Sequence, residues 1–315
     1  MSKQIKPLAL RKGDTIGIIS PSGPIFFRKG YVKKGIKILH EMGFKTKLGR
    51  YALKETGYMA GSDDERAADL MEMFEDKEIK AIFATRGGDA ASHLLDMLDY
   101  KKIKKNPKIL MGLSDITALL NSINKKTGLV TFHGPLLAWG INCSFFGLKS
   151  MDSYSKEYML KALCSKKPIG YIEPIKKRIV IKQGKAEGVL VGGNLDCVEK
   201  LCGTEYEPDF KNKILFWEEF REYVEDIDRD LTHLRLQGVF DKINGMVIGH
   251  LEHYLAKGER YERFEKMIKN ITKGYDFPIL KAEEFGHGLK NATIPIGAKA
   301  RISNNKFEII ESGVR

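Results

Sequence analysis

The segment KILMGLSDITALLNSI, residues 108–123, places a serine where one structural pattern gives way to another. The apolar residues up to Gly112 predict a buried strand, and the spacing of apolar residues after Asp115 predicts an amphipathic helix. Ser114 therefore lies at the corner between strand and helix. Such a serine can cap the helix, or it can act as a nucleophile displayed at the end of a sheet.

Two features of this corner favour a nucleophile. Gly112 permits the tight approach that a nucleophile elbow needs, although Ile116 stands where the G-x-S-x-G motif has its second glycine. The N–H of Asp115 lies at the start of a helix, where it can bind an oxyanion. Ser-Asp before an apolar helix, with Thr117 three residues on, also fits capping, so the corner alone leaves both roles open.

A serine nucleophile needs a base and a carboxylate that orients the base. Histidines and acidic residues follow several strand-like segments: His133, His250 and His287, and Glu218, Glu219 and Glu252. A structural role is an alternative for each of them, and spacing alone does not choose among them.

A glycine pair, Gly87-Gly88, follows the apolar run at 79–85. It predicts a tight turn between strand and helix, and its backbone can supply a second oxyanion donor. The G-x-G-x-x-G pattern is absent, so a dinucleotide is not indicated.

Strands and helices alternate through the first half of the chain. Strands are predicted at 15–20, 79–85 and 108–112, and helices at 30–43, 61–76 and 90–99. This alternation predicts an α/β fold with a doubly wound parallel sheet, which binds ligands at the carboxyl ends of its strands. The residues expected at those ends are Ser20, Gly87, Gly88, Ser114 and His133.

The second half mixes strands and helices and closes on a predicted hairpin with a Ser-Asn-Asn turn. Residues 166–178 are rich in proline and lysine and have weak periodicity. We therefore expect an N-terminal doubly wound domain at 1–165, a linker at 166–178, and a β-rich α/β domain at 179–315.

Composition excludes several classes of function. The 315 residues carry a net charge of +12, but the lysines are scattered among acidic residues, which favours an anionic small substrate over nucleic acid. The HLEH segment at 250–253 matches no zinc-protease motif, and the four cysteines lack C-x-x-C spacing. We expect no metal, no cofactor, no membrane span and no signal peptide, and hence a cytoplasmic protein.

An ordered set of segments resembles the LD-carboxypeptidase family, which includes murein tetrapeptide LD-carboxypeptidases and microcin C self-immunity peptidases. The segments are GDTIGIISPSGP, GYMAGSDDERAADL, ATRGGDAASHLLDMLD, GLSDITALLNSINKKTGLVTFHGP, EGVLVGGNLDCVEKLCGT, ILFWEEF with IDRDLTHLRLQGVFDKINGMVIG, and FGHGLKNATIPIGAKARI. They cover nearly the whole chain and occur in the family's order.

The resemblance implies a serine peptidase with its site in a cleft between two domains. By position, Ser114 is the nucleophile and is expected to cap its helix as well. The triad carboxylate is Glu218 and the base is His287. The oxyanion donors are the N–H groups of Gly88 and Asp115.

Three further residues are candidates for substrate contact. Asp89 and Leu113 stand where the family commonly has Tyr and an aromatic residue, and Trp217 lies beside the triad carboxylate. Trp217 could support a nucleobase, although a residue ending a buried strand is more often part of the core.

We predict that the protein hydrolyses an L,D-peptide bond and releases D-Ala from murein tetrapeptide during cell-wall recycling. A peptidyl-nucleotide hydrolase of the microcin C type is the alternative within the family. A binding module that grips an anionic ligand at helix N-termini, without catalysis, is the alternative of another class. A peptide or peptidyl small molecule is the expected partner, and we expect a homodimer.

Overall fold

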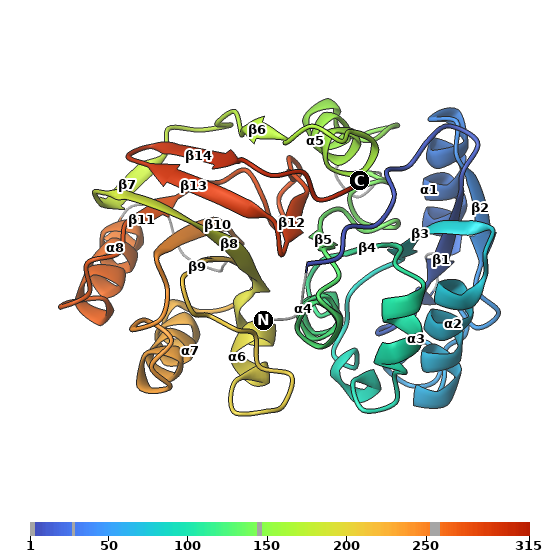
Figure 1. The fold of residues 1–315 in the computed structure, drawn as a ribbon, viewed down its shortest axis with the longest axis horizontal. Helices are drawn as coiled ribbons and strands as arrows, with labels where there is room; N and C mark the ends of the chain where they lie inside the picture. Colours follow the sequence, from blue (N-terminus) through green and yellow to red (C-terminus); the bar gives the residue numbers. More distant parts are fainter. Residues whose placement is uncertain (1–3, 27–28, 144–146, 253–258) are drawn as a thin grey trace.

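Two β-sheets with flanking helices lie side by side in the molecule (Figure 1). The structure is a computed structural model that describes residues 4–26, 29–143, 147–252 and 259–315. Each sheet carries part of the candidate site, so the way in which the sheets meet decides the geometry of that site.

The first sheet has six strands in the order β12-β5-β4-β3-β1-β2. Its first five strands along the chain are parallel, and β12 is antiparallel to β5. The order 2-1-3-4-5 is a doubly wound arrangement whose ligand crevice lies at the carboxyl ends of β1 and β3. The bounds are β1 (Thr15–Ile19), β2 (Lys45–Leu48), β3 (Ile79–Ala84), β4 (Ile109–Gly112), β5 (Thr131–His133) and β12 (Ile294–Ile296).

The helices of this half are α1 (Lys29–Glu41), α2 (Asp63–Glu75), α3 (Tyr100–Lys105), α4 (Ile116–Thr127) and α5 (Ser153–Cys164). Helix α2 begins with a capping box, in which Ser62 and Glu65 bond each other's backbone N–H groups. Helix α4 ends at Gly128, whose φ of +81° is the left-handed conformation that stops a helix. The predicted α/β class and doubly wound sheet are confirmed.

The helix predicted at 90–99 is wrong. Only a single 3-10 turn, Ser92–Leu94, forms there, and α3 begins separately after it. The carbonyl of Leu95 accepts a bond from the Tyr100 hydroxyl at 2.6 Å instead of a helical N–H. The Asp99 side chain accepts from the Lys102 N–H and so caps a new helix.

The second sheet has eight strands in the order β6-β14-β13-β8-β9-β10-β11-β7. Strands β8 to β11 are parallel, and antiparallel strands border them on both sides, including the predicted hairpin of β13 and β14. The strands are β6 (Gly170–Tyr171), β7 (Ile179–Lys182), β8 (Lys185–Asn194), β9 (Lys213–Phe220), β10 (Gly245–Glu252), β11 (Ile279–Lys281), β13 (Lys299–Ser303) and β14 (Lys306–Ile309). Its helices are α6 (Leu195–Leu201), α7 (Val224–Leu236) and α8 (Glu259–Ile271).

Strand β9 packs against a different core on each face, because alternate side chains of a strand point to opposite sides. Leu215 and Trp217 belong to the core shared with α6, α7 and α8. Ile214 and Phe216 belong to the core that includes the first sheet. By this alternation, Glu218 faces the first sheet and Glu219 faces α6.

Two strands connect parts of the chain that are distant in sequence. Strand β12 comes from the second half and pairs with β5 of the first sheet. Strand β6 lies within 166–178, the segment expected to be a linker, and pairs with β14. The segment is therefore tied to the edge of the second sheet by its backbone.

Candidate active site

Ser114 lies on a strained corner between β4 and α4. Its φ of +63° is in the left-handed region, which a residue with a side chain seldom adopts. A Cβ added to Gly112 would lie 2.5 Å from Cγ2 of Ile116, so only glycine allows the strand to turn this closely into the helix. Backbone strain of this kind is typical of functional positions.

The expectation that Ser114 also caps α4 is wrong. The N-cap position is Asp115, and no side chain there makes a capping bond. The Asp115 carboxylate is instead buried and accepts from the N–H groups of Ala90 at 2.9 Å and Ala91 at 2.7 Å, and from the Ser22 hydroxyl. These buried donors use the Asp115 carboxylate, and α4 therefore begins without a side-chain cap from Asp115 or Ser114.

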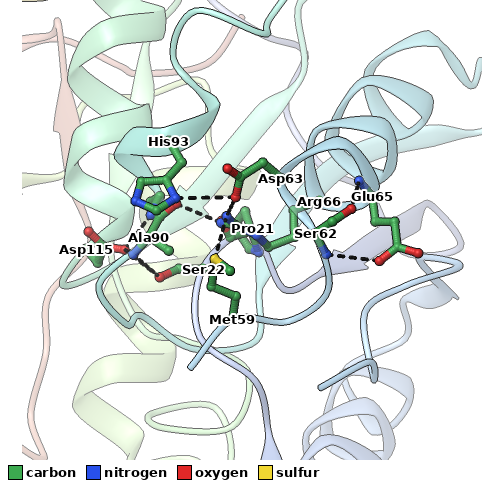
Figure 2. A network of polar contacts seen from close by, with 11 residues as sticks. Pro21, Ser22, Met59, Ser62, Asp63, Glu65, Arg66, Ala90, His93 and Asp115 are labelled. Atoms are coloured by element: carbon green, nitrogen blue, oxygen red, sulfur yellow. Dashed lines mark hydrogen bonds and ion pairs between the residues drawn. The ribbon is translucent and has the colours of Figure 1, made fainter. Parts of the chain in front are cut away.

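Arg66 completes a polar network that holds the loops around the corner (Figure 2). Its guanidinium is almost fully buried and donates from Nη1 to the carbonyls of Pro21 and Ala90, each at 2.7 Å. It also pairs with Asp63 at the start of α2. The turn after β1 and the glycine turn after β3 are therefore fixed to each other and to Asp115.

The glycine pair lies directly against this corner. A Cβ on Gly87 would lie 2.7 Å from the Ser114 Cβ, and one on Gly88 would lie 2.5 Å from the Gly23 nitrogen. The φ of Gly88 is +152°, which further favours glycine. Within the described residues, the N–H groups of Gly88 and Asp115 donate to no protein acceptor, as an oxyanion hole requires.

Glu218 and His287 form a buried acid–base pair. The Nδ1 of His287 lies 2.7 Å from Oε2 of Glu218, and Glu218 has no exposed surface. Gly286 has a φ of +117°, and a Cβ there would lie 2.8 Å from the same carboxylate oxygen. The Phe220 ring stacks on the His287 imidazole with centroids 4.4 Å apart and an interplanar angle of 16°. The glycine and the phenylalanine together fix the orientation of the imidazole.

The electrostatics of Glu218 favour a permanent negative charge. Burial by itself raises the pKa of this carboxyl, but His287 and His133 together outweigh burial and hold the pKa well below its usual range. An ionised carboxylate bonded to Nδ1 orients the imidazole and leaves Nε2 free to accept a proton.

The three candidate histidines occupy different environments. His287 lines the same cavity as Ser114, whereas His133 is completely buried, with Nε2 3.6 Å from Oε1 of Glu218. His250 bonds to Glu283 at 2.9 Å and to Glu252 at 3.1 Å, and lines neither cavity at the corner. Glu252 is thereby paired with His250 rather than with His287.

Two cavities meet at Ser114. One of about 370 Å³ is mainly apolar, and its lining includes Ile25, Leu136, Trp139, Phe220, Gly87 and His287. The other, of about 550 Å³, is polar, and its lining includes Asp89, Asn194, Asp196, Lys200, Glu219 and Glu222. Both are lined by Ser114, Gly88, Arg86, Phe220 and Arg221. A larger hollow of about 840 Å³ along α7 and α8 includes none of the candidate residues.

Of the three predicted substrate contacts, only Asp89 lines a cavity. Trp217 and Leu113 are wrong as substrate contacts, because Trp217 is fully buried and Leu113 almost so. Trp217 points away from the site, toward α8, where its ring meets Phe264 with centroids 6.4 Å apart. Strand alternation places it on the face opposite Glu218.

Sequence reasoning missed several residues of the site. Phe220 is the last residue of β9 and Arg221 follows it, and both line both cavities. Asn194 donates to Glu219 at 2.6 Å. Burial, followed by the charge of Glu218, raises the pKa of Glu219 to about 8. The adjacent pair Glu218-Glu219 could have indicated that acidic groups lie on both faces of this strand, because neighbouring side chains of a strand point to opposite sides.

The described residues contain no group of three or more side chains arranged to hold a metal ion. Among the helices described, none has the length and apolar character needed to cross a membrane. Cys143, Cys164, Cys197 and Cys202 are free thiols.

Both halves of the chain are similar to known proteins. Residues 16–134 match the model of an LD-carboxypeptidase N-terminal domain, and residues 187–302 match that of an LD-carboxypeptidase C-terminal domain. A probable murein peptide carboxypeptidase of Bacillus subtilis is 37% identical over 99% of this chain and 96% of its own length. The microcin C7 self-immunity protein of Escherichia coli is 33% identical, over 97% of this chain and 95% of its own.

Solved structures agree with the sequence comparison. A protein from Bacillus anthracis that resembles the self-immunity protein superposes with a TM-score of 0.88 at 33% identity, covering 98% of this chain and 99% of that one. The microcin C7 self-immunity protein in complex with aspartyl sulfamoyl adenosine gives 0.86 at 30% identity, covering 99% and 100%. A muramoyltetrapeptide carboxypeptidase from Oxalobacter formigenes gives 0.78 at 26% identity, covering 93% and 97%.

Proposed function

Because this chain belongs to the LD-carboxypeptidase family of peptidases, we propose that it is a serine carboxypeptidase that hydrolyses an L,D-peptide bond. Its substrate in this proposal is cytoplasmic murein tetrapeptide, from which it releases D-Ala during cell-wall recycling. The observation that carries the proposal is that Ser114 and His287 line one cavity while His287 is bonded to a buried Glu218.

The proposal assigns one group to each step of the reaction. His287 Nε2 accepts the Ser114 proton as the serine oxygen attacks the scissile carbonyl, and Glu218 stabilises the imidazolium. The N–H groups of Gly88 and Asp115 bind the oxyanion. His287 then protonates the leaving amine, and D-Ala departs. Water, deprotonated by His287, hydrolyses the acyl-serine and restores the enzyme.

The cations at the site support a peptide with several carboxylates. Arg86 and Arg221 line both cavities, so one of them is near the substrate on either side of Ser114. Among the described residues, the Arg221 guanidinium pairs with no carboxylate and lies over the Phe220 ring at 4.9 Å. A carboxypeptidase must recognise a terminal carboxylate, and an arginine does this with two parallel hydrogen bonds.

One observation favours a second candidate, a peptidyl-nucleotide substrate. Trp139 and Phe220 line the apolar cavity beside Ser114, and aromatic faces of this kind can stack on a nucleobase. A related protein has been solved with an aminoacyl sulfamoyl nucleoside. The two substrates would be bound by different side chains, because the peptide carboxylates need the arginines and the nucleobase needs the aromatic rings.

The experiment that tests the proposal compares kcat/KM for L-Ala-γ-D-Glu-diamino acid-D-Ala with kcat/KM for an aminoacyl sulfamoyl adenylate. We expect the tetrapeptide to be preferred. A preference of a hundredfold or more for the adenylate, about 2.7 kcal/mol in transition-state binding, would replace the tetrapeptide with the nucleotide. Absence of turnover with both, together with equally tight binding of the tetrapeptide to wild type and Ser114→Ala, would instead identify a non-catalytic binding module.

The homodimer is a separate part of the proposal. Light scattering in solution is expected to give twice the chain mass of 35.6 kDa. A monomer at micromolar concentration would contradict the dimer and leave the proposed chemistry unaffected.

A further inference from the structure

Glu218 is buried between two histidines rather than beside one. Its Oε2 is 2.7 Å from Nδ1 of His287, and its Oε1 is 3.6 Å from Nε2 of His133. Both Glu218 and His133 have no exposed surface. Water therefore does not reach the contact from bulk solvent, and the two side chains depend on protein partners.

The facing atoms of this contact have no other partner. Among the described residues, Oε1 of Glu218 and both ring nitrogens of His133 make no hydrogen bond. Leaving a buried polar atom without a hydrogen-bond partner is destabilising. A distance of 3.6 Å is too long for a hydrogen bond, but a small rotation of the imidazole brings a donor on Nε2 onto the carboxylate.

The position of His133 in the fold gives this contact its importance. His133 is on β5, directly beside Gly112 of β4 in the sheet that carries Ser114, whereas Glu218 is on β9 of the second sheet. The imidazole packs edge-on against Phe216, with centroids 5.6 Å apart. A Cβ on Gly193 would lie 3.1 Å from its Cδ2, so the second sheet approaches the ring closely. The contact joins the nucleophile's sheet to the carboxylate's sheet at the site itself.

We propose that His133 is a positioning residue for the reaction, and that its Nε2–H donates to Oε1 of Glu218 and holds Oε2 on His287. This inference rests on the proposed serine-peptidase function. It extends the triad to a chain of four side chains, in which the outermost member never touches substrate. Nε2 is the ring nitrogen that faces the carboxylate, so the proposed donor is the proton on Nε2.

The charge on Glu218 depends on both histidines. Burial raises the pKa of Glu218, and the imidazoles of His287 and His133 together lower it further than burial raises it. The neighbouring titratable group, Glu219, points from the opposite face of β9 toward Asn194. Without His133, only His287 opposes burial, so the Glu218–His287 pair binds its proton at higher pH.

A matched pair of variants tests the role. His133→Phe keeps a flat ring but has no donor, and His133→Gln keeps an N–H that reaches about as far as Nε2. For His133→Phe we expect kcat on the preferred substrate to fall about 10- to 100-fold with KM within about threefold. The ascending limb of the kcat/KM pH profile should move up by about one unit, and His133→Gln should recover most of both losses. If His133→Phe does not fold, the smaller His133→Leu takes its place.

A second readout needs no substrate and so separates this inference from the proposed function. The hydrogen-bonded Nδ1 proton of His287 should give a downfield proton NMR signal whose titration midpoint rises in His133→Phe and not in His133→Gln. If kcat falls equally in His133→Phe and His133→Gln and the titration midpoint of the His287 signal does not move, His133 only fills space in the core. Wild-type kinetics and midpoint in His133→Phe would also overturn the proposal. Lack of hydrolysis by the wild type would count against the proposed function alone.

Discussion

At the scale of single residues, the most informative feature is a serine whose hydroxyl has no structural task. Within the described residues, the Ser114 side chain makes no hydrogen bond, and its backbone is held in a conformation that favours glycine. A strained residue persists only where its surroundings fix it, here the crowded contact with Gly87. The side chain is thereby presented to the cavity rather than used for stability.

The substitution Ser114→Ala should abolish activity without loss of stability. We expect kcat to fall by about 10⁴ or more, because only the oxyanion donors and substrate binding remain. The free energy of unfolding should change by less than about 0.5 kcal/mol, since no capping bond is lost. Ser122→Ala, which removes a buried hydroxyl on the same helix, is the control and should retain activity. An acyl adduct found by mass spectrometry on another residue would contradict the assignment.

The loss of kcat on substitution of each histidine should depend on the environment of its side chain. His287→Ala is expected to lower kcat nearly as far as Ser114→Ala, because residues that act as one unit are not additive. His250→Ala should change kcat by less than about tenfold, since His250 bonds to Glu283 and Glu252 outside both cavities. Steady-state kinetics on folded variants decide the order. The reverse ranking would assign the base to His250.

Glu219 should make stability depend on pH. Its pKa is about 8 in the folded chain and about 4.3 when unfolded, so between these values the folded state holds a proton that the unfolded state has lost. Its contribution to stability is therefore complete below about pH 4 and is lost as the pH rises to 8.

The variant Glu219→Gln cannot ionise and should flatten this dependence. We expect the free energy of unfolding of the wild type, relative to the variant, to fall by about 1–3 kcal/mol between pH 5 and pH 9. Urea unfolding at several pH values measures it, and exposed Glu225→Gln is the control. Parallel curves for the wild type and Glu219→Gln would show that Glu219 ionises normally.

At the scale of elements, the site depends on loops that are joined by buried charges. Asp115 follows Ser114 and bonds the loop after β3, and Arg66 bonds that same loop to the turn after β1. These bonds cross between loops rather than running within a helix or strand. They set the distance between the N–H groups of Gly88 and Asp115, which must converge on one oxyanion.

Removing the Asp115 carboxylate should therefore affect both stability and catalysis. Asp115→Ala leaves the buried N–H of Ala91 without an acceptor and leaves that of Ala90 with only the more distant Ser22 hydroxyl at 3.3 Å, so we expect a loss of about 2–4 kcal/mol in unfolding free energy. We expect kcat to fall about 10- to 100-fold with little change in KM. Asp115→Asn keeps one acceptor oxygen and should lose less of both. If Asp115→Ala has the melting temperature and kcat of the wild type, the Asp115 carboxylate supports neither stability nor catalysis.

At the scale of the whole molecule, the candidate site exists only where the two sheets meet. The first sheet supplies Ser114 and the glycine turn, and the second supplies Glu218 on β9. Strand β12 crosses back to the first sheet soon after His287, which ties His287 to the half that carries Ser114 (Figure 1). The net charge of +12 adds a long-range field that attracts anions to the molecule as a whole.

That field predicts a salt dependence. For the multiply anionic tetrapeptide, kcat/KM should fall severalfold between about 20 mM and 200 mM NaCl, while kcat stays constant. An uncharged peptide ester is the control substrate and should show no such fall. Equal salt effects on both substrates would point to a change in the enzyme rather than to electrostatic attraction.

The sequence by itself determined the local features of this protein. Alternating apolar runs gave the parallel strands, and Gly112 with Ser114 marked the corner where β4 turns into α4. The glycine pair at the end of β3 was also visible. These features follow from preferences that act between neighbouring residues, so a short window of sequence contains them.

The tertiary structure alone decided which side chains meet. His287 and Glu218 are 69 residues apart, so their spacing carries no information about contact, and only the resemblance to a family selected them in advance. Glu218 faces the first sheet and Glu219 faces α6 because the packing of β9 decides which face is which. The cap predicted for Ser114 failed because α4 begins one residue later, with Asp115 as its N-cap, and buried donors from two distant loops hold the Asp115 carboxylate. The packing of the whole chain decides which side chains are buried and which faces of the sheets meet. This packing overrides the local structural preference of any single segment.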